Sequence, residues 1–197
     1  LKIYKLRSKV DFKENNNLLS IIFFSKNIIP TNKDIIFFYD PRNNNLGIKA
    51  YINKKSNDLG FLKKLKKYND DIYNQILMKN LVPNSSNDLI LNKSLLLENN
   101  FQNINAIDWN KGCYIGQEIT ARMKYRSLLK KQIYVLELIS GMINPGDRII
   151  ENEIIIGYVV STAGKYVLCM LRIDIVKNDS INKKIIKTNS ATELKFL

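Results

Sequence analysis

The chain is organised around the stretch Lys111-Gly112-Cys113-Tyr114-Ile115-Gly116-Gln117-Glu118. It holds one of the two cysteines in the 197-residue sequence, together with two glycines, a lysine, an aromatic residue and a carboxylate. Charged residues are almost never fully buried unless they are paired, and glycine has no side chain with which to fill a core. The composition of this stretch therefore indicates a functional site, around which neighbouring segments could build a pocket.

A helix is expected immediately after Gly116, because residues 117–124 are mostly acceptable helix formers. Free backbone N–H groups at a helix start attract negative charge, and Lys111 and Arg122 would further favour a thiolate at Cys113. From the residues alone, a functional thiol and a buried structural thiol are equally consistent with Cys113. Cys169 lies within an apolar run and is expected in the core.

Glu118, Arg122 and Arg126 follow one another at intervals of four and should share one helical face. As a surface ion pair such a face contributes only about 0.3–0.5 kcal/mol. Turned toward a pocket, an arginine could instead bind a carboxylate through two hydrogen bonds, with Glu118 fixing its direction.

Three further residues could hold a flat ring. Trp109 and Tyr114 could stack on it, although both could equally pack in the core. Glu98 could accept hydrogen bonds from a ring N–H or amino group, or could begin a solvated turn. Together with the arginine, these are the groups that a pterin with a glutamate tail would require.

Composition excludes several function classes. The chain has no histidine, which excludes a Ser-His-Asp triad and most zinc sites within it. Two cysteines cannot supply the four thiolates of a protein-held iron–sulfur cluster, so no self-held metal cluster is expected. Few cysteines fit a reducing compartment, and neither a membrane-spanning run nor a signal peptide is visible. No glycine-rich phosphate loop is present, which makes a nucleotide enzyme unexpected.

The formal net charge of +13 raises the question of nucleic-acid binding. Lysine, asparagine and isoleucine are all abundant, and the lysines are scattered. Only residues 63–67 form a dense basic run, which we expect to be one solvated helix face. Direct nucleic-acid binding is therefore not the expected activity.

Two structural regions are predicted. Strands at residues 9–13, 18–24, 35–39 and 48–52 should form a small, mostly antiparallel sheet. A helix that ends near residues 79–80 is predicted by apolar residues that recur at spacings of three and four. They are Leu62, Leu65, Tyr68, Ile72 and Ile76, with Leu77 beside them. Strands followed by a helix favour an α+β module.

Short strands at close spacing follow, and they predict a small β-barrel over the C-terminal residues. The expected strands are residues 133–138, 147–150, 154–160, 165–173, 184–188 and 193–196. The predicted domains are thus residues 1–127 and 128–197, with the boundary near Ser127.

At residues 111–122 the chain resembles the YgfZ-type folate-binding proteins, whose hallmark is K-G-C-Y-x-G-Q-E followed by an arginine four residues on. The resemblance extends to the family's Y-x-L-R-x-K-V motif at residues 4–10 and its D-P-R…L-G turn at residues 40–47. Further family-like positions lie before the hallmark and in the C-terminal region. They are Val82-Pro83, Asp88, Glu98-Asn99, Phe101, Gly157, Ser161 and Leu171-Arg172. Leu97 is a departure, since the family usually has proline there.

This resemblance implies an aminomethyltransferase-like folate-binding module with an antiparallel sheet and helices, followed by a C-terminal β-barrel, because the family is homologous to the glycine cleavage T-protein. It implies a tetrahydrofolate-binding accessory factor that serves iron–sulfur client proteins and their assembly machinery. The setting would be the bacterial cytoplasm or the mitochondrial matrix. Part of the family's N-terminal fold is expected to be missing from this segment.

The resemblance also assigns the expected site. Cys113 would be the functional thiol, and folate would be contacted by Glu98, Trp109, Lys111, Gly112, Tyr114, Gly116, Gln117, Glu118 and Arg122. Two other functions remain open: a folate-dependent aminomethyltransferase and a factor in tRNA modification.

Overall fold

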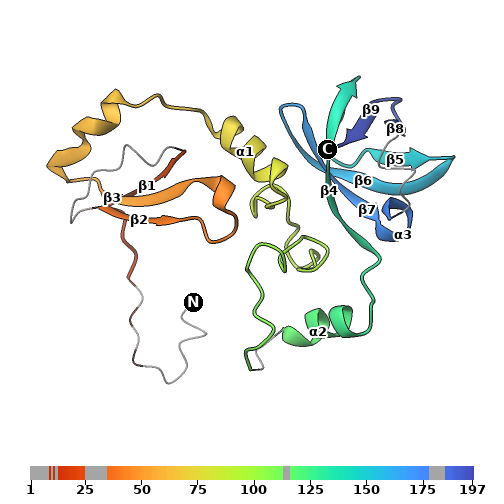
Figure 1. The fold of residues 1–197 in the computed structure, drawn as a ribbon, viewed down its shortest axis with the longest axis horizontal. Coiled ribbons are helices and arrows are strands. Elements are labelled where there is room, and N and C mark those ends of the chain that lie inside the picture. Colours follow the sequence, from red (N-terminus) through yellow and green to blue (C-terminus); the bar gives the residue numbers. More distant parts are fainter. Residues whose placement is uncertain (1–8, 10, 12, 25–34, 113–115, 178–184) are drawn as a thin grey trace. The chain divides into compact units, whose positions relative to one another are not determined.

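The computed structural model describes residues 9, 11, 13–24, 35–112, 116–177 and 185–197 (Figure 1). It divides into two compact units. The first contains strands β1 (Leu18–Phe23), β2 (Ile35–Tyr39) and β3 (Ile48–Asn53) with the 3₁₀ helix η4 (Asn57–Lys64). The second contains the remaining helices and strands.

The predicted antiparallel sheet is confirmed in the first unit. Its strand order is β1-β3-β2, and both outer strands run antiparallel to β3. One face buries Phe23, Ile35, Ala50 and Ile52, and η4 contributes Phe61, whose ring centroid lies 6.3 Å from that of Phe23. β-branched and aromatic residues on a half-buried pleated surface account for these strands.

The strand expected at residues 9–13 is not found where the structure can test it. Lys9, Asp11 and Lys13 lie outside any strand, and Val10 and Phe12 fall outside the described residues. The rest of the family-like motif at residues 4–8 also lies outside them. With polar residues at every other position and an asparagine-rich turn beyond, this short segment has little apolar surface to bury.

The prediction of one continuous helix through Leu62 and Ile76 is wrong, because two helices occupy this region. The 3₁₀ helix η4 ends at Lys64, and α1 begins at Asp70 and ends at Lys79. Asn69 caps α1, since its side-chain oxygen accepts a hydrogen bond from the Ile72 N–H at 3.2 Å. The basic run at residues 63–67 is exposed at its lysines as expected, but it straddles the break and is not a helix face.

The apolar residues of the predicted stripe serve different cores. Leu62 and Leu65 pack in the first unit. Ile76, with Leu77 beside it, packs in the second, around the buried Leu46 of the short 3₁₀ helix η3 (Asn44–Leu46). Tyr68 and Ile72 are exposed and belong to neither core. The apolar residues were thus spaced by three and four although they do not lie on one continuous helix.

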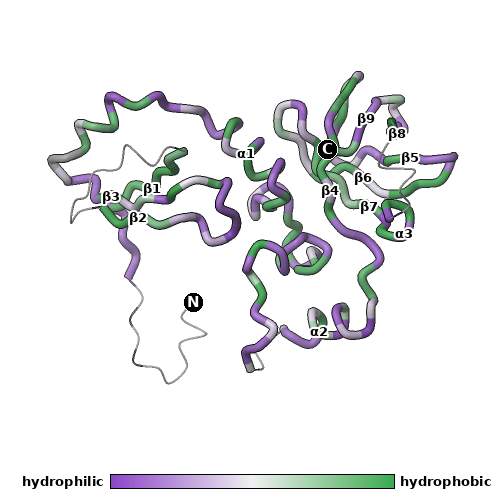
Figure 2. Tube along the Cα trace, in the orientation of Figure 1, coloured by the Kyte–Doolittle hydropathy of each residue, from purple (hydrophilic) through white to green (hydrophobic). Residues whose placement is uncertain are grey.

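The predicted C-terminal β-barrel is confirmed. Its strands are β4 (Lys131–Ser140), β5 (Arg148–Glu151), β6 (Ile154–Ala163), β7 (Tyr166–Arg172), β8 (Ile185–Thr188) and β9 (Glu193–Phe196). They close in the order β4-β7-β6-β5-β8-β9 with antiparallel pairing throughout. Figure 2 shows the hydrophobic colour along β6 and β7, whereas the segment joining η4 to α1 is mostly hydrophilic.

The barrel interior is filled by side chains such as Leu136, Ile149, Leu171 and Leu194, each with no exposed surface. Gly157 is required where β6 meets β7, because a Cβ there would clash with the carbonyl oxygen of Met170. The short helix α3 (Ile173–Val176) follows β7 and was not predicted, since a single turn shows no periodicity.

Helix α1 packs on the outside of the barrel. Met78 shares an apolar cluster with Ile133, Ala163, Leu168 and Met170 from β4, β6 and β7. The expected domain boundary near Ser127 stays a prediction, and β4 begins shortly after it. Within the described chain, no helix is both long and apolar enough to cross a membrane.

Candidate functional site

The helix predicted after Gly116 is α2 (Gln117–Tyr125). Gly116 precedes it with φ of 88°, in the left-handed region that glycine enters readily. Thr120 and Met123 are buried beneath the helix, while Glu118 faces the other way. Gly116 therefore marks where the helix begins, and the buried Thr120 and Met123 show that Glu118 lies on the exposed face.

Glu118 and Arg122 form the expected ion pair on the outer face of α2. The Arg122 guanidinium donates to the Glu118 carboxylate at 2.6 Å, and their side chains are 58% and 74% exposed. At such exposure the pair contributes little to stability. Its effect is to orient a guanidinium that solvent, and any ligand arriving from solvent, can reach.

Trp109 lies against the C-terminal end of α2. Its ring meets that of Tyr125 edge to face, with centroids 6.4 Å apart. The Lys124 ammonium sits 3.7 Å from the Trp109 ring centroid, a cation–π contact. One face of the indole is therefore occupied by Lys124, so a ligand ring could stack only on the other face.

Glu98 does not begin a solvated turn, which removes one of its two expected roles. The residue is only 9% exposed, although it lies in a run of turns. Its carboxylate lies 3.5 Å from the Lys131 ammonium, and its backbone carbonyl accepts the Ile133 N–H at 2.9 Å. Both contacts fix Glu98 to the first residues of β4.

The other expected site residues divide into described and undescribed ones. Lys111 and Gly112 are exposed, and Gln117 is half-buried at the start of α2. A Cβ at Gly112 would meet no atom within 4 Å, so this glycine faces open space. Cys113 and Tyr114 lie outside the described residues, so the roles expected of them stay predictions.

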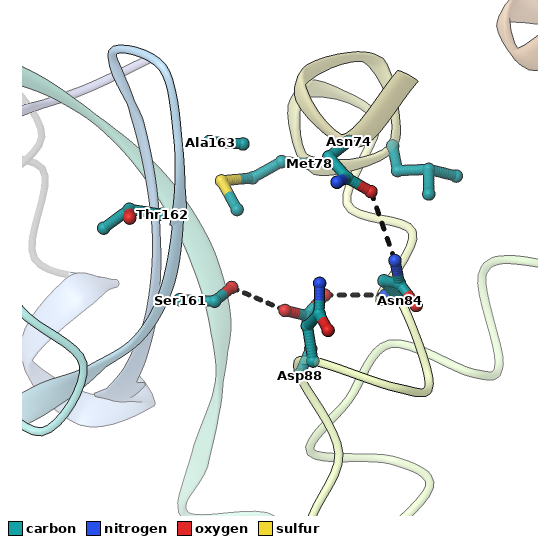
Figure 3. Close-up of a pocket in the computed structure, with 9 residues that line it drawn as sticks. Asn74, Met78, Asn84, Asp88, Ser161, Thr162 and Ala163 are labelled. Carbon is teal, nitrogen blue, oxygen red and sulfur yellow. Dashed lines mark hydrogen bonds between the residues drawn. The ribbon is translucent and has the colours of Figure 1, made fainter. Parts of the chain in front are cut away.

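A second polar cluster was not predicted as a site. Asp88 is 9% exposed, and its carboxylate accepts hydrogen bonds from the Ser161 hydroxyl at 2.5 Å and the Asn84 N–H at 2.6 Å. The Asn84 side chain in turn donates to Asn74 on α1 at 3.1 Å (Figure 3). Asp88 and Ser161 were noticed only as family-like positions, because no local pattern reveals a contact between residues so distant in sequence.

These side chains line a small pocket between α1 and β6. Its walls also include Leu77, Met78, Asn87, Thr162 and Ala163 (Figure 3). About 30 Å³ is open to the centres of water-sized molecules, which is room for roughly two waters. This pocket is far too small for a pterin, and it is not the expected folate site.

The second cysteine, Cys169, is confirmed as a core residue. It has no exposed surface, and its thiol contacts the Val167 carbonyl oxygen at 3.8 Å. Burial raises the pKa of this thiol well above its ordinary value. Among the described residues, no group of three or more acidic, cysteine or histidine side chains is placed to hold a metal ion.

Comparison with known proteins finds relatives that carry two names, IBA57 and YgfZ. The mitochondrial "iron-sulfur cluster assembly factor IBA57 homolog" of Dictyostelium discoideum is 31% identical over 150 residues, covering 68% of this chain and 36% of that protein. The "tRNA-modifying protein YgfZ" of Aliivibrio fischeri is 36% identical over 87 residues, covering 44% of this chain and 27% of that protein. The human mitochondrial "iron-sulfur cluster assembly factor IBA57" is 34% identical over 65 residues, covering 33% of this chain and 18% of that protein.

No family model matches the chain. The chain spans between 18% and 36% of the length of the three relatives above. Its hallmark at residues 111–122 is nevertheless unbroken, and the similar proteins carry both names, IBA57 and YgfZ. The chain therefore belongs to the protein family that includes IBA57 and YgfZ.

Proposed function

We propose that this protein is a tetrahydrofolate-binding accessory factor for the assembly or maintenance of iron–sulfur clusters in client enzymes. The observation that carries the proposal is the complete hallmark, which ends on Arg122 with its guanidinium oriented by Glu118. Kinship with proteins named as iron–sulfur cluster assembly factors supports the cluster-related role.

The chemistry of the side chains fits a folate. The Glu98 carboxylate, held by Lys131, is an acceptor for the N–H and amino groups of a pterin ring. The exposed Arg122 can bind a carboxylate of the glutamate tail through two parallel hydrogen bonds. Lys111 would add positive charge near that tail, and Gly112, with no side chain, would allow close approach.

A bound tetrahydrofolate would supply ring nitrogens that can carry a one-carbon unit. This chain's residues would bind and orient it, with Glu98 at the ring and Arg122 at the tail. Gln117 and Tyr114 would complete the contacts, and Trp109 would offer its remaining ring face. Cys113 would be the reactive thiol that takes part in the assembly or maintenance of clusters in client enzymes.

The partners we propose are iron–sulfur client proteins and components of the assembly machinery. The names of the relatives place some of them in mitochondria, and the YgfZ relatives are bacterial. We therefore propose the mitochondrial matrix or the bacterial cytoplasm as the site of action. In either compartment a thiol at Cys113 would be kept reduced.

Rescue of an iron–sulfur enzyme tests the role of the thiol. In cells lacking their own family member, full-length protein should restore the activity of a cluster-dependent enzyme, and Cys113→Ala should abolish that rescue. Cys169→Ala is the matched control, because it removes the buried thiol and should leave rescue intact at equal protein level. Full rescue by Cys113→Ala would show that the Cys113 thiol is not required for this function.

Two further functions remain as alternatives. A folate-dependent aminomethyltransferase would share fold and ligand. It would transfer the methylene unit of an aminomethylated carrier protein to tetrahydrofolate, releasing methylenetetrahydrofolate, ammonia and the free carrier. Release at a catalytic rate would favour the transferase. A role in tRNA modification is favoured by the name of the YgfZ relatives. It would also follow indirectly if a tRNA-modifying enzyme that carries a cluster were among the clients.

A further inference from the structure

Positive charge is also concentrated in a second short segment, besides the basic run at residues 63–67. Five of the ten residues at positions 122–131 are basic, and no acidic residue occurs from 119 to 136. The segment covers the last turns of α2 and the stretch that leads into β4. A compositional bias that acts on the whole chain does not account for this local excess.

Two of these five charges have acidic partners. Arg122 pairs with Glu118, and Lys131 with Glu98. The other three, Lys124, Arg126 and Lys130, are exposed. Basic residues in the last turn of a helix favour its dipole, but this explanation does not extend to Lys130, beyond the helix end.

An exposed aromatic ring lies among these charges. Tyr125 is 71% exposed, its ring centroid is 5.8 Å from the Lys124 ammonium, and Arg126 follows it directly. Trp109 supports the ring from one side through the edge-to-face contact. A ring held in place, solvent-exposed and flanked by cations combines a stacking surface with charges for a phosphate backbone.

We propose that Lys124, Tyr125, Arg126 and Lys130 form a binding surface for unpaired RNA. Exposed bases would stack on Tyr125, as single-stranded nucleic acid does on aromatic side chains, and phosphates would contact Arg126 and Lys130. Lys124 holds the Trp109–Tyr125 pair and adds its charge to the same surface.

Three other kinds of partner fit the surface less well: an anionic membrane, a hydrophobic protein groove and an acidic protein. An anionic membrane or a hydrophobic protein groove requires a continuous apolar stripe along the helix. The exposed apolar side chains of α2 are Ile119 and Tyr125, which are six positions apart and therefore point in different directions. An acidic protein would use the charges but has no need of an exposed ring.

The proposal is independent of folate binding, because Arg122 is assigned to the folate site and the RNA surface uses neighbouring residues. It can therefore fail or succeed separately.

Salt-dependent binding of a labelled RNA tests the surface. Full-length protein would be titrated against a fluorescein-labelled, unstructured single-stranded RNA of about twelve nucleotides, over a series of salt concentrations. Arg126→Gln with Lys130→Gln should lower the salt slope by roughly one to one and a half, since each phosphate contact on a single strand contributes about 0.7. Tyr125→Leu should weaken binding by roughly fivefold or more and leave the slope unchanged.

The matched control removes two scattered charges from the same unit, by Lys93→Gln with Lys177→Gln, both exposed. It should leave affinity and slope almost unchanged. The proposal is overturned if the wild-type protein does not bind RNA at low salt, or if the control variant loses as much affinity as the α2 variant. Competition by polyglutamate as effective as that by unlabelled RNA would instead assign the surface to an acidic protein.

Discussion

At the scale of single residues, the best-defined polar feature is the hydrogen bond from Ser161 to Asp88. It joins residues 73 positions apart and ties the turns that precede Glu98 to strand β6. A carboxylate that is 9% exposed needs such donors, because an unsatisfied buried charge is strongly destabilising. Glu98 is tied to β4 in the same way, so this segment is fixed to the barrel at both positions.

Removing the Ser161 hydroxyl should therefore destabilise the protein. We expect Ser161→Ala to lower the free energy of unfolding by about 1.5–3 kcal/mol, since the hydrogen bond is made to a charged, buried acceptor. Urea unfolding of Ser161→Ala, Asp88→Ala and the double variant would measure the coupling, expected to be about 1 kcal/mol or more. Additive effects would mean that the two side chains do not interact in solution.

Cys169 gives a prediction on pH. Burial raises the pKa of its thiol, so the folded protein holds this proton more tightly than the unfolded chain does. The free energy of unfolding should then fall as pH rises above about 8.5, where an unfolded cysteine begins to ionise.

The measurement compares unfolding between pH 7.5 and 9.5 in a Cys113→Ser background, with and without Cys169→Ala. The two proteins share all other titrating groups, so the difference in slope reports Cys169 alone. Disulfide-exchange reagents should also leave Cys169 unmodified until the protein is unfolded. Equal slopes and rapid modification of the native protein would contradict its burial.

At the scale of elements, most strands were predictable and the helices less so. Alternating or continuous apolar runs such as those of β3 and β7 mark strands regardless of what covers them. The spacing from Leu62 to Ile76 looked helical, but these two residues serve different cores, and Tyr68 and Ile72 between them are exposed. The break at Asn69 follows from its preference for capping a helix, which weighs against any helix running through it.

The cap gives a test of this break. Asn69→Ala should destabilise the protein by about 1 kcal/mol, because the Ile72 N–H at the start of α1 loses its acceptor. Asn69→Ser retains a capping oxygen and should restore most of the loss. If Asn69→Ala were neutral or stabilising in thermal unfolding, a continuous helix through this position would be the better description.

At the scale of the whole molecule, the chain forms two compact units, and the second contains both the closed barrel and α2, which carries the last residues of the family hallmark. The sequence predicted the barrel and the helix with its Glu118–Arg122 pair, because both depend on local spacing. The partner of Glu98 and the Asp88–Ser161 contact depend on how distant segments meet, which no local pattern encodes. The proposed function depends on whether the chain that carries the hallmark at residues 111–122 binds folate.

Titration of the full-length protein with tetrahydrofolate tests that claim most directly. We expect saturable binding that Glu98→Gln and Arg122→Gln each weaken by about tenfold or more, since each removes a charged hydrogen-bonding partner of the ligand. Glu137→Gln is the matched control, because Glu137 pairs with Lys165 on the barrel and should not affect binding. No saturable binding by the wild-type protein, or equal affinities in all four proteins, would contradict a folate site at Glu98 and Arg122.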